Sequence, residues 1–319
     1  KFLAKAAGLD ADGFIVDFED SVPAAEKAAA RRHLAAYAPY LHGKPVWVRP
    51  NAPGTMQFDE DLAAICETPG IAGLILPKVE DTDTLLSTAD AIGARERAAG
   101  LAPGSLKIIL IVESALGVIR SFELATASDR VETLCFGGAR DGDLMADLGC
   151  DWSNEGGTLE HARARTLVAA RAARCQCPLD GVFVDVNDHA GFEWDTRRSR
   201  SLGYRGRTLI HPSQIEPANR LYTPTPTEIA ESRRLVEAFD AAVRRAELRC
   251  ERLEGAGTAG EQEEVKAARG ERPSECLPDP LRGARDERPG AVPGTEIGHL
   301  KEKLKIGNTG SMRSEEHTS

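Results

Sequence analysis

The chain has 319 residues, of which 41% are hydrophobic, and it carries a formal net charge of −10. An acidic chain of this kind is not expected to bind nucleic acid through a general surface, because phosphate-binding proteins usually carry a basic excess. The sequence contains no run of about 20 apolar residues that would span a bilayer and no charged-then-apolar leader, so we expect no membrane partner and a cytoplasmic location. The seven cysteines lack a C-x₂-C pair, which favours reduced thiols over a zinc or redox site.

Between Asp10 and Ile215, short β-rich apolar runs alternate with longer helical stretches, the pattern of repeated βα units around a parallel sheet. The predicted strands, in chain order, are residues 13–17, 45–49, 73–76, 107–112, 131–136, 181–185 and 208–210. The predicted helices are residues 24–37, 81–99, 118–128, 158–173 and 227–245. Several strands are apolar on both faces, as expected where helices cover a sheet outside and side chains fill it inside. The pattern predicts an α/β fold of the TIM (β/α)₈ barrel type.

Both ends of the chain depart from this pattern. The predicted strands are one fewer than such a barrel needs, and the amphipathic segment Lys1–Leu9 has no strand in front of it, so we expect the first barrel strand to be missing. After Phe239 no aromatic residue occurs, and the sequence from about Glu247 is rich in Gly, Pro, Glu and Arg without any period. Such a segment cannot bury enough apolar surface to offset the entropy of ordering it. We therefore expect a catalytic barrel domain over residues 1–246 and a low-complexity tail over residues 247–319 that is disordered or artefactual.

The active site of a (β/α)₈ barrel lies at the carboxyl ends of its strands, so the polar residues just after each apolar run are the candidates. In chain order they are residues 17–20, 49–51, 77–80, 113–114, 137–143, 185–188 and 211–212. Acidic residues dominate this set, and carboxylates that converge on one point repel one another unless a cation lies between them. Oxygen ligands without His or Cys pairs suit Mg²⁺ or Mn²⁺ better than Zn²⁺. The sequence therefore predicts a site for a hard divalent metal.

Six segments of the chain resemble the motifs of a known family, and they occur in the same order. They are DFED with a following EK and AR, VRPN, LPKVED, IVESALGV, FGGARDGDLMADLG and LGYRGRTLIHPSQI. Together they run from about Ala6 to Ala242 and are similar to the signature of the citrate lyase β-subunit-like family within the HpcH/HpaI aldolase/citrate lyase superfamily. One such motif would be a weak signal, whereas six in order are specific.

The resemblance implies a barrel enzyme that makes or breaks carbon–carbon bonds with the help of Mg²⁺, with Mn²⁺ as a substitute. Its substrate would be a 3-hydroxyacyl-CoA similar to malyl-, citramalyl- or citryl-CoA, cleaved by a retro-Claisen reaction or formed by the reverse condensation. A metal-dependent 2-oxo-acid aldolase that works without CoA is one alternative, and a non-catalytic barrel fragment is another. Family members are homo-oligomers, so a trimer or hexamer is also implied.

The same resemblance assigns the metal ligands and the substrate clamp. It implies that Glu113 and an Asp of the stretch after the fifth predicted strand bind Mg²⁺. Counting from the Asp-Leu-Gly that follows selects Asp143, whereas counting from Phe136 selects Asp141, and Asp143 is the preferred register. A helix N-cap is the ordinary alternative for Asp143. Arg49 matches the family arginine that clamps the substrate's carboxylate and carbonyl oxygens, a task that suits a planar, permanently charged side chain.

Four further residues receive supporting roles. The resemblance implies that Glu19 and Asp20 accept hydrogen bonds from metal-bound water and orient the arginine, although Asp20 equally suits a helix cap. Asn51 is expected to contact substrate. Lys78 is expected to offset negative charge and contact substrate, with a solvated lysine and a Schiff-base nucleophile as the other readings. The sequence lacks the Asp-Gly-x-x-Val-Asp segment that family members carry after the last barrel helix, so the resemblance implies fold and site more strongly than activity.

Overall fold

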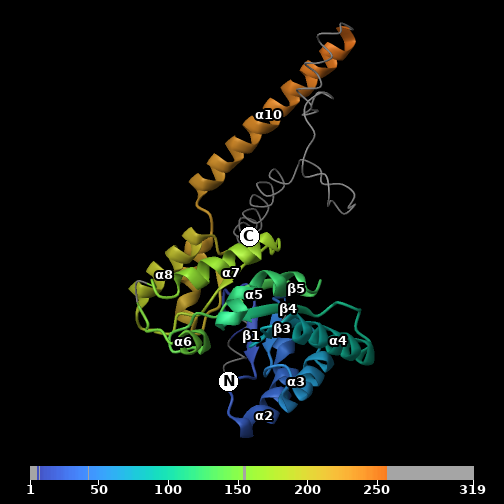
Figure 1. The fold of residues 1–319 in the computed structure, drawn as a ribbon, viewed down its shortest axis with the longest axis vertical. Coiled ribbons are helices and arrows are strands. Elements are labelled where there is room, and N and C mark those ends of the chain that lie inside the picture. The colour runs from blue at the N-terminus through green and yellow to red at the C-terminus, as the bar shows by residue number, and fades with distance from the viewer. Residues whose placement is uncertain (1–5, 7, 42, 154–155, 257–319) are drawn as a thin grey trace, which may run out of the picture. The chain divides into compact units, whose positions relative to one another are not determined.

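The structure is a computed structural model that describes residues 6, 8–41, 43–153 and 156–256. Its contacts divide the chain into two compact units, Lys1–Tyr222 and Thr223–Ser319. The first unit holds the sheet and the candidate site, and the second holds the long helix α10 (Pro226–Ala256) (Figure 1).

The first unit is built on a parallel sheet of seven strands, counted over the described residues, whose order in space follows the order in the chain. The strands are β1 (Phe14–Asp17), β2 (Val46–Arg49), β3 (Ile71–Leu76), β4 (Lys107–Val112), β5 (Val131–Phe136), β6 (Leu179–Asp180) and β7 (Gly206–Arg207). Because neighbouring strands are parallel, their carboxyl ends lie along one edge of the sheet, and in the register of β1 with β2 Asp17 lies opposite Arg49. Within the described residues β1 and β7 do not pair with each other.

Helices follow the strands as expected of βα units. Those of the first unit are α2 (Lys27–Tyr37), α3 (Met56–Glu67), α4 (Thr82–Ala99), α5 (Ala115–Thr126), α6 (Asp143–Leu148), α7 (Glu160–Ala172), α8 (His189–Leu202) and α9 (Ile215–Tyr222). Several begin at a residue whose side chain accepts a hydrogen bond from the helix's first turn, as Thr55, Asp81 and Ser114 do. These caps fix where the chain turns from a strand end into a helix, and hence where the strand-end side chains point.

The strand residues alternate between two apolar layers. Leu74, Leu76 and Leu110 are almost fully buried in the larger core between sheet and helices. Ile75, Ile109 and Cys135 point to the other side, where Trp47, Ile111 and Leu179 join them in a smaller cluster. A strand apolar on both faces therefore has a core on each side, as the sequence indicated. The parallel α/β architecture expected from the sequence is confirmed, while the absence of a first strand stays a prediction.

Several details differ from the sequence-based expectation, including the helices α3, α6, α8 and α9, which were not among the predicted helices. The sixth and seventh strands are short and lie two residues earlier than expected, at 179–180 and 206–207 instead of 181–185 and 208–210. Helix α10 continues to Ala256, beyond the expected end at residue 245. Residues 247–256, the first ten of the tail expected over residues 247–319, belong to this helix. Residues 257–319 lie outside the described residues, and so does most of the segment 1–9. None of the described helices combines the length and the apolar character that crossing a membrane requires.

Candidate active site

Charged side chains gather where the first strands of the sheet end. Among the described residues, this strand-end cluster combines five acidic and two basic side chains, linked by ion pairs or by electrostatic coupling. They are Asp17, Glu19, Asp20, Arg49, Lys78, Glu113 and Asp143. Six of the seven site residues expected from the sequence to act in catalysis or metal binding are thus brought together, and Asp17 is added to them.

Arg49 is held in place by two carboxylates of the preceding strand end. Its Nε and Nη2 atoms lie 2.7 and 2.6 Å from the two oxygens of Asp17, and its Nη1 atom lies 3.1 Å from Glu19 Oε2. Burial alone would lower the pKa of the Arg49 guanidinium, but the hydrogen bonds and charge of Asp17 outweigh it and raise that pKa above its ordinary value. The guanidinium is therefore a fixed, permanent positive charge at the edge of the sheet.

Lys78 contacts both sides of the cluster from an unusual backbone conformation. Its φ of 57° lies in the left-handed region, which non-glycine residues seldom occupy. The Lys78 Nζ atom lies 3.0 Å from Glu19 Oε1, 3.1 Å from Asp20 Oδ2 and 3.3 Å from Asp143 Oδ2. Burial would lower the pKa of this ammonium group, but the nearby carboxylates of Glu19 and Asp20 raise it. The lysine is therefore a cation among carboxylates.

Glu113 ends β4 beside this lysine. The main-chain N–H of Lys78 donates a hydrogen bond to Glu113 Oε1 at 2.8 Å. Burial raises the pKa of the Glu113 carboxyl to about 7, and the charges of Glu19 and Asp143 add to the rise. A carboxylate that resists ionisation because of buried like charges is relieved when a cation binds near it.

The structure separates the two candidate aspartates of the loop after β5. Asp143 is the first residue of α6 and reaches the cluster through its ion pair with Lys78. Asp141 has a left-handed φ of 58°, its side chain is 84% exposed, and its ion pair is with Arg140 at 3.6 Å. Asp147, one turn further along α6, accepts a hydrogen bond from the N–H of Ala115 at 2.7 Å. Asp143 is thus the aspartate that belongs to the strand-end cluster.

Gly137 lets the end of β5 pass close to Glu113. Its N–H donates a hydrogen bond to the carbonyl of Val112 at 2.8 Å. A Cβ atom at residue 137 would lie 2.5 Å from Glu113 Cβ and 2.9 Å from Ile111 Cγ2, well inside van der Waals contact. Glycine is therefore required here for a close approach of two strand ends and not for a special turn.

The donor set fits a hard divalent cation. Glu113 and Asp143 offer carboxylate oxygens beside a lysine that already balances part of their charge. Over the described ranges, the structure has no group of three or more His, Cys, Asp and Glu side chains arranged to hold a metal. Mg²⁺ is commonly held by one or two carboxylates, with waters and substrate oxygens completing its shell. Glu19 Oε1, a buried atom, has an ion-pair contact but no hydrogen bond among the described residues.

Asn51 lies behind the cluster and not at its open side. It is 8% exposed, and its side-chain amide is hydrogen-bonded to Lys27 of α2, Asp61 of α3 and the carbonyl of Phe18. Neither Lys27 nor Asp61 was expected at the site, because a charged residue inside a helix usually lies on a solvated face. The only sequence signal was the place of Lys27 in the EK motif.

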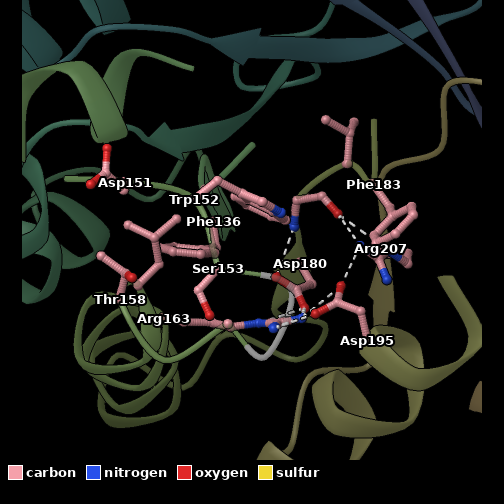
Figure 2. A pocket seen from close by; sticks show the side chains of 15 residues that line it. Phe136, Asp151, Trp152, Ser153, Thr158, Arg163, Asp180, Phe183, Asp195 and Arg207 are labelled. Atoms are coloured by element: carbon pink, nitrogen blue, oxygen red, sulfur yellow. Dashed lines mark hydrogen bonds and ion pairs between the residues drawn. The ribbon is translucent and has the colours of Figure 1, made fainter. Parts of the chain in front are cut away.

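A second group of charged residues lines a hollow at β6 and β7, beside the end of β5. Figure 2 shows the carboxylates of Asp180 and Asp195 side by side at the guanidinium of Arg163, and Asp195 also pairs with Arg207. Phe136, Trp152 and Phe183 are among the residues that line the hollow. His211, another strand-end residue, accepts a hydrogen bond at Nδ1 from the N–H of Ser213 and so begins a short turn.

Comparison with known proteins identifies the family. The sequence profile described as HpcH/HpaI aldolase/citrate lyase matches residues 1–212. Citrate lyase subunit beta of Escherichia coli (strain K12) is 37% identical over 237 residues, covering 73% of this chain and 76% of the relative. The L-malyl-CoA/beta-methylmalyl-CoA lyase of Cereibacter sphaeroides is 32% identical over 263 residues, covering 76% and 81%.

Solved structures of other proteins are also similar to this chain. RipC from Yersinia pestis superposes with a TM-score of 0.59 at 30% identity, covering 70% of this chain and 94% of the other. CitE from Mycobacterium tuberculosis, in complex with magnesium, acetoacetate and coenzyme A, gives a TM-score of 0.59 at 26% identity, covering 95% and 91%. The chain belongs to the HpcH/HpaI aldolase/citrate lyase family. Citrate lyase and malyl-CoA lyase are carbon–carbon lyases, so the expected enzyme class is confirmed.

Proposed function

We propose that the chain cleaves a 3-hydroxyacyl-CoA similar to malyl-, citramalyl- or citryl-CoA by a Mg²⁺-dependent retro-Claisen reaction, or catalyses the reverse condensation. The observation that carries this proposal is the convergence of Glu113, Asp143 and Arg49 on one edge of the sheet, with Lys78 between the carboxylates. The printed names and ligands of the relatives support it, since they include malyl-CoA lyase and a CitE structure with magnesium and coenzyme A.

Glu113 and Asp143 would hold the metal, with Asp141 as the alternative in the second register. When bound, a divalent cation supplies a Lewis acid that stabilises negative charge developing on substrate oxygens. Both carboxylates must be ionised to serve, and Lys78 assists by offsetting part of their mutual repulsion until the cation arrives. Asp143 lies in the strand-end cluster, whereas Asp141 is largely exposed, and this difference supports the first register.

Arg49 would bind the substrate's carboxylate. Its guanidinium is held by Asp17, so little side-chain entropy is lost when an anionic group approaches it. Glu19 and Asp20 would orient the cationic side chains, since Glu19 touches both Arg49 and Lys78 and Asp20 touches Lys78. As the carbon–carbon bond breaks, negative charge builds up on the departing thioester, and a fixed positive field at this edge lowers the energy of that state.

The test is an assay of the purified chain with malyl-, citramalyl- and citryl-CoA and with a set of 2-hydroxy and 2-oxo acids lacking CoA. We expect CoA-dependent cleavage with Mg²⁺ or Mn²⁺ that EDTA abolishes. Turnover of an oxo-acid substrate without CoA would favour the aldolase alternative. Folded protein that binds the cation but turns over no substrate would favour a non-catalytic barrel.

The same samples test the role of Lys78. Its raised pKa keeps the amine protonated, which opposes attack on a carbonyl group. Borohydride added with substrate should therefore leave Lys78 unmodified. Activity that survives EDTA, together with a borohydride adduct on Lys78, would overturn the metal-dependent mechanism. Light scattering would test the homo-oligomer, a trimer or hexamer, that the family resemblance implies.

A further inference from the structure

A lysine of the following helix, α2, is hydrogen-bonded to main-chain carbonyls of the segment that carries Glu19. Lys27 Nζ donates hydrogen bonds to the carbonyl of Phe18 at 2.7 Å, to the carbonyl of Glu19 at 3.0 Å and to Asn51 Oδ1 at 2.6 Å. An ammonium group has three N–H donors, and three acceptors occupy them here. The lysine is thus fully engaged by the protein, with two contacts to the end of β1 and one to the end of β2.

Asn51 joins this lysine to a buried acid. Its Nδ2 atom donates to Asp61 Oδ2 at 2.6 Å and to the carbonyl of Phe18 at 3.1 Å, and its main-chain N–H donates to Asp61 Oδ2 at 2.8 Å. The partners fix the orientation of the amide, because the ammonium group can only donate and the ionised carboxylate can only accept. Every polar group of the Asn51 side chain is engaged within the protein.

Asp61 completes the network. It is fully buried on α3, and its Oδ1 atom accepts a hydrogen bond from Arg31 Nε of α2 at 2.6 Å. Removal of one partner from such a buried charged network leaves another partner unpaired, so the members respond as a unit. The chain of contacts from Arg31 through Asp61 and Asn51 to Lys27 therefore holds α2, α3 and the ends of β1 and β2 in one arrangement.

Two residues of the strand-end cluster depend on that arrangement. Glu19 is held at its own carbonyl by Lys27, and its carboxylate contacts Arg49 and Lys78. Arg49 is two residues before Asn51, and its carbonyl accepts a hydrogen bond from the N–H of Phe18 at 2.9 Å. A shift of either strand end would move the two side chains relative to each other and to Glu113.

We propose that Lys27 and Asn51 are positioning residues, which set the relative placement of Glu19 and Arg49 at the metal and substrate site. Asn51 thereby acts from behind the site instead of touching substrate. The inference rests on the proposed function, because the placement matters for chemistry only if the strand-end cluster binds metal and substrate.

The experiment compares Lys27→Met with Lys44→Met. Lys44 is a matched control, since it is also half-buried and donates to a main-chain carbonyl, that of Leu9 at 2.7 Å, but it precedes β2 at the opposite end of the same pair of strands. Both changes remove one positive charge. At a temperature where circular dichroism finds both variants folded, Mg²⁺ affinity is measured by calorimetry, and kcat and KM are measured with the substrate found for the wild type.

Lys27→Met should weaken Mg²⁺ binding and lower kcat/KM by about 10- to 100-fold each, the usual loss when a group that orients a metal site is removed. Lys44→Met should change both by less than about twofold, because Lys44 lies outside the network. If Lys27→Met is unfolded, Lys27→Gln, which keeps two N–H donors on a shorter stem, takes its place. Adding Asn51→Ala to the lysine variant should cost little more than the larger single change, because the two residues act as a unit.

The outcomes separate the two proposals. A wild-type chain that binds no Mg²⁺ and cleaves no substrate would overturn the proposed function and the positioning role with it. A wild-type chain that binds Mg²⁺, with affinity and kcat/KM equal in the two lysine variants, would overturn the positioning role alone. Additive losses for Lys27 and Asn51 would show that they do not form one network.

Discussion

Two groups of charged side chains lie on the same sheet and differ in how their charges are balanced. In the group between β6 and β7, Arg163 and Arg207 pair with Asp180 and Asp195, and the arginines are 7% and 2% exposed. Arg207 also donates to the carbonyl of Gly181. Positive and negative charges match, and the hydrogen bonds close within the protein.

The strand-end cluster has more acids than bases and is partly open. Lys78 is 39% exposed, and Asp143 is 50% exposed. The pKa of Glu113 is raised by burial and by its acidic neighbours. Perturbed groups of this kind mark functional sites more often than closed ion pairs do. The comparison teaches that a balanced network stabilises the fold, whereas an unbalanced one is set up for a ligand that supplies positive charge.

The largest expected effect is at Glu113. Mg²⁺ at a hundredfold excess over its Kd should stabilise the wild type by about 2.7 kcal/mol, because a ligand that binds only the folded state shifts the equilibrium. Glu113→Ala should remove this gain entirely and abolish turnover, while the metal-free protein becomes no less stable, since the change removes a crowded carboxylate. Thermal melts with and without Mg²⁺ measure both. A variant that keeps the full Mg²⁺ gain would remove Glu113 from the site.

Arg163→Met should have the opposite profile. Breaking a buried pair by removing one partner typically costs about 3–5 kcal/mol, because Asp180 is left buried without its counter-ion. We expect a lower urea midpoint and, where the variant is folded, an unchanged Mg²⁺ affinity. A change in Mg²⁺ affinity as large as that of Glu113→Ala would mean that the two groups are not separate.

Arg49→Ala should affect chemistry without affecting the metal. We expect kcat/KM to fall by about 10²- to 10³-fold, the range found when one fixed donor to a developing charge is removed. Mg²⁺ affinity should change little, because the arginine's role is on the substrate. Arg49→Lys serves as the control, since it keeps the charge but loses the two-point contact with Asp17. Wild-type activity in Arg49→Lys would argue for charge alone, whereas activity as low as that of Arg49→Ala would show that the planar fork is needed.

Substitution of the two aspartates after β5 should weaken Mg²⁺ binding to different extents. Asp143→Asn should weaken Mg²⁺ binding by at least about tenfold, no less than the loss of an orienting group. Asp141→Asn should change the Mg²⁺ affinity by less than about twofold, because the Asp141 side chain is exposed and lies outside the strand-end cluster. Isothermal titration of both variants gives the answer. The reverse order would select the second register.

A further expected effect is a pH dependence of the metal-free stability and of the Mg²⁺ affinity. Folding raises the pKa of Glu113 from 4.5 to about 7, so between these values the folded protein holds a proton that the unfolded chain has lost. Its metal-free stability should therefore fall as pH rises through this window. Because Mg²⁺ must displace that proton, its affinity should rise by up to about tenfold per pH unit below 7 and level off above. Glu113→Gln should remove the stability slope.

Much of the fold could be read from the sequence, and the exceptions have physical causes. The first five strands were expected within two residues of their observed ends, because apolar β-branched runs bounded by polar residues define them. The sixth was misplaced because most of its apolar run, Gly181 to Phe183, lines the hollow after the strand has ended. A Cβ at residue 181 would lie 2.4 Å from the carbonyl oxygen of Phe136, a close approach that strand propensity does not reveal.

The site was predictable where it depends on strand ends and not where it depends on helices. Glu19, Arg49, Lys78 and Glu113 follow apolar runs directly, and parallel strands must bring such residues together. Asp61 is different, because its burial results from the packing of α3 against α2 and the β2 end. In the sequence it is one of several acids on a helix, and only tertiary contacts distinguish it.

The close approach at Gly137 limits which residues related chains can carry at positions 113 and 137. Any side chain there would strike the Cβ atom of residue 113, which every residue except glycine possesses. Gly137 is thus a condition of the strand arrangement, whatever residue 113 does chemically. Among related chains, one with Gly137 and a changed residue 113 can keep the same strand arrangement, whereas a chain without Gly137 must move the two strand ends apart. A comparison of residues 113 and 137 in related chains would therefore separate changes of the carboxylate from changes of the strand arrangement.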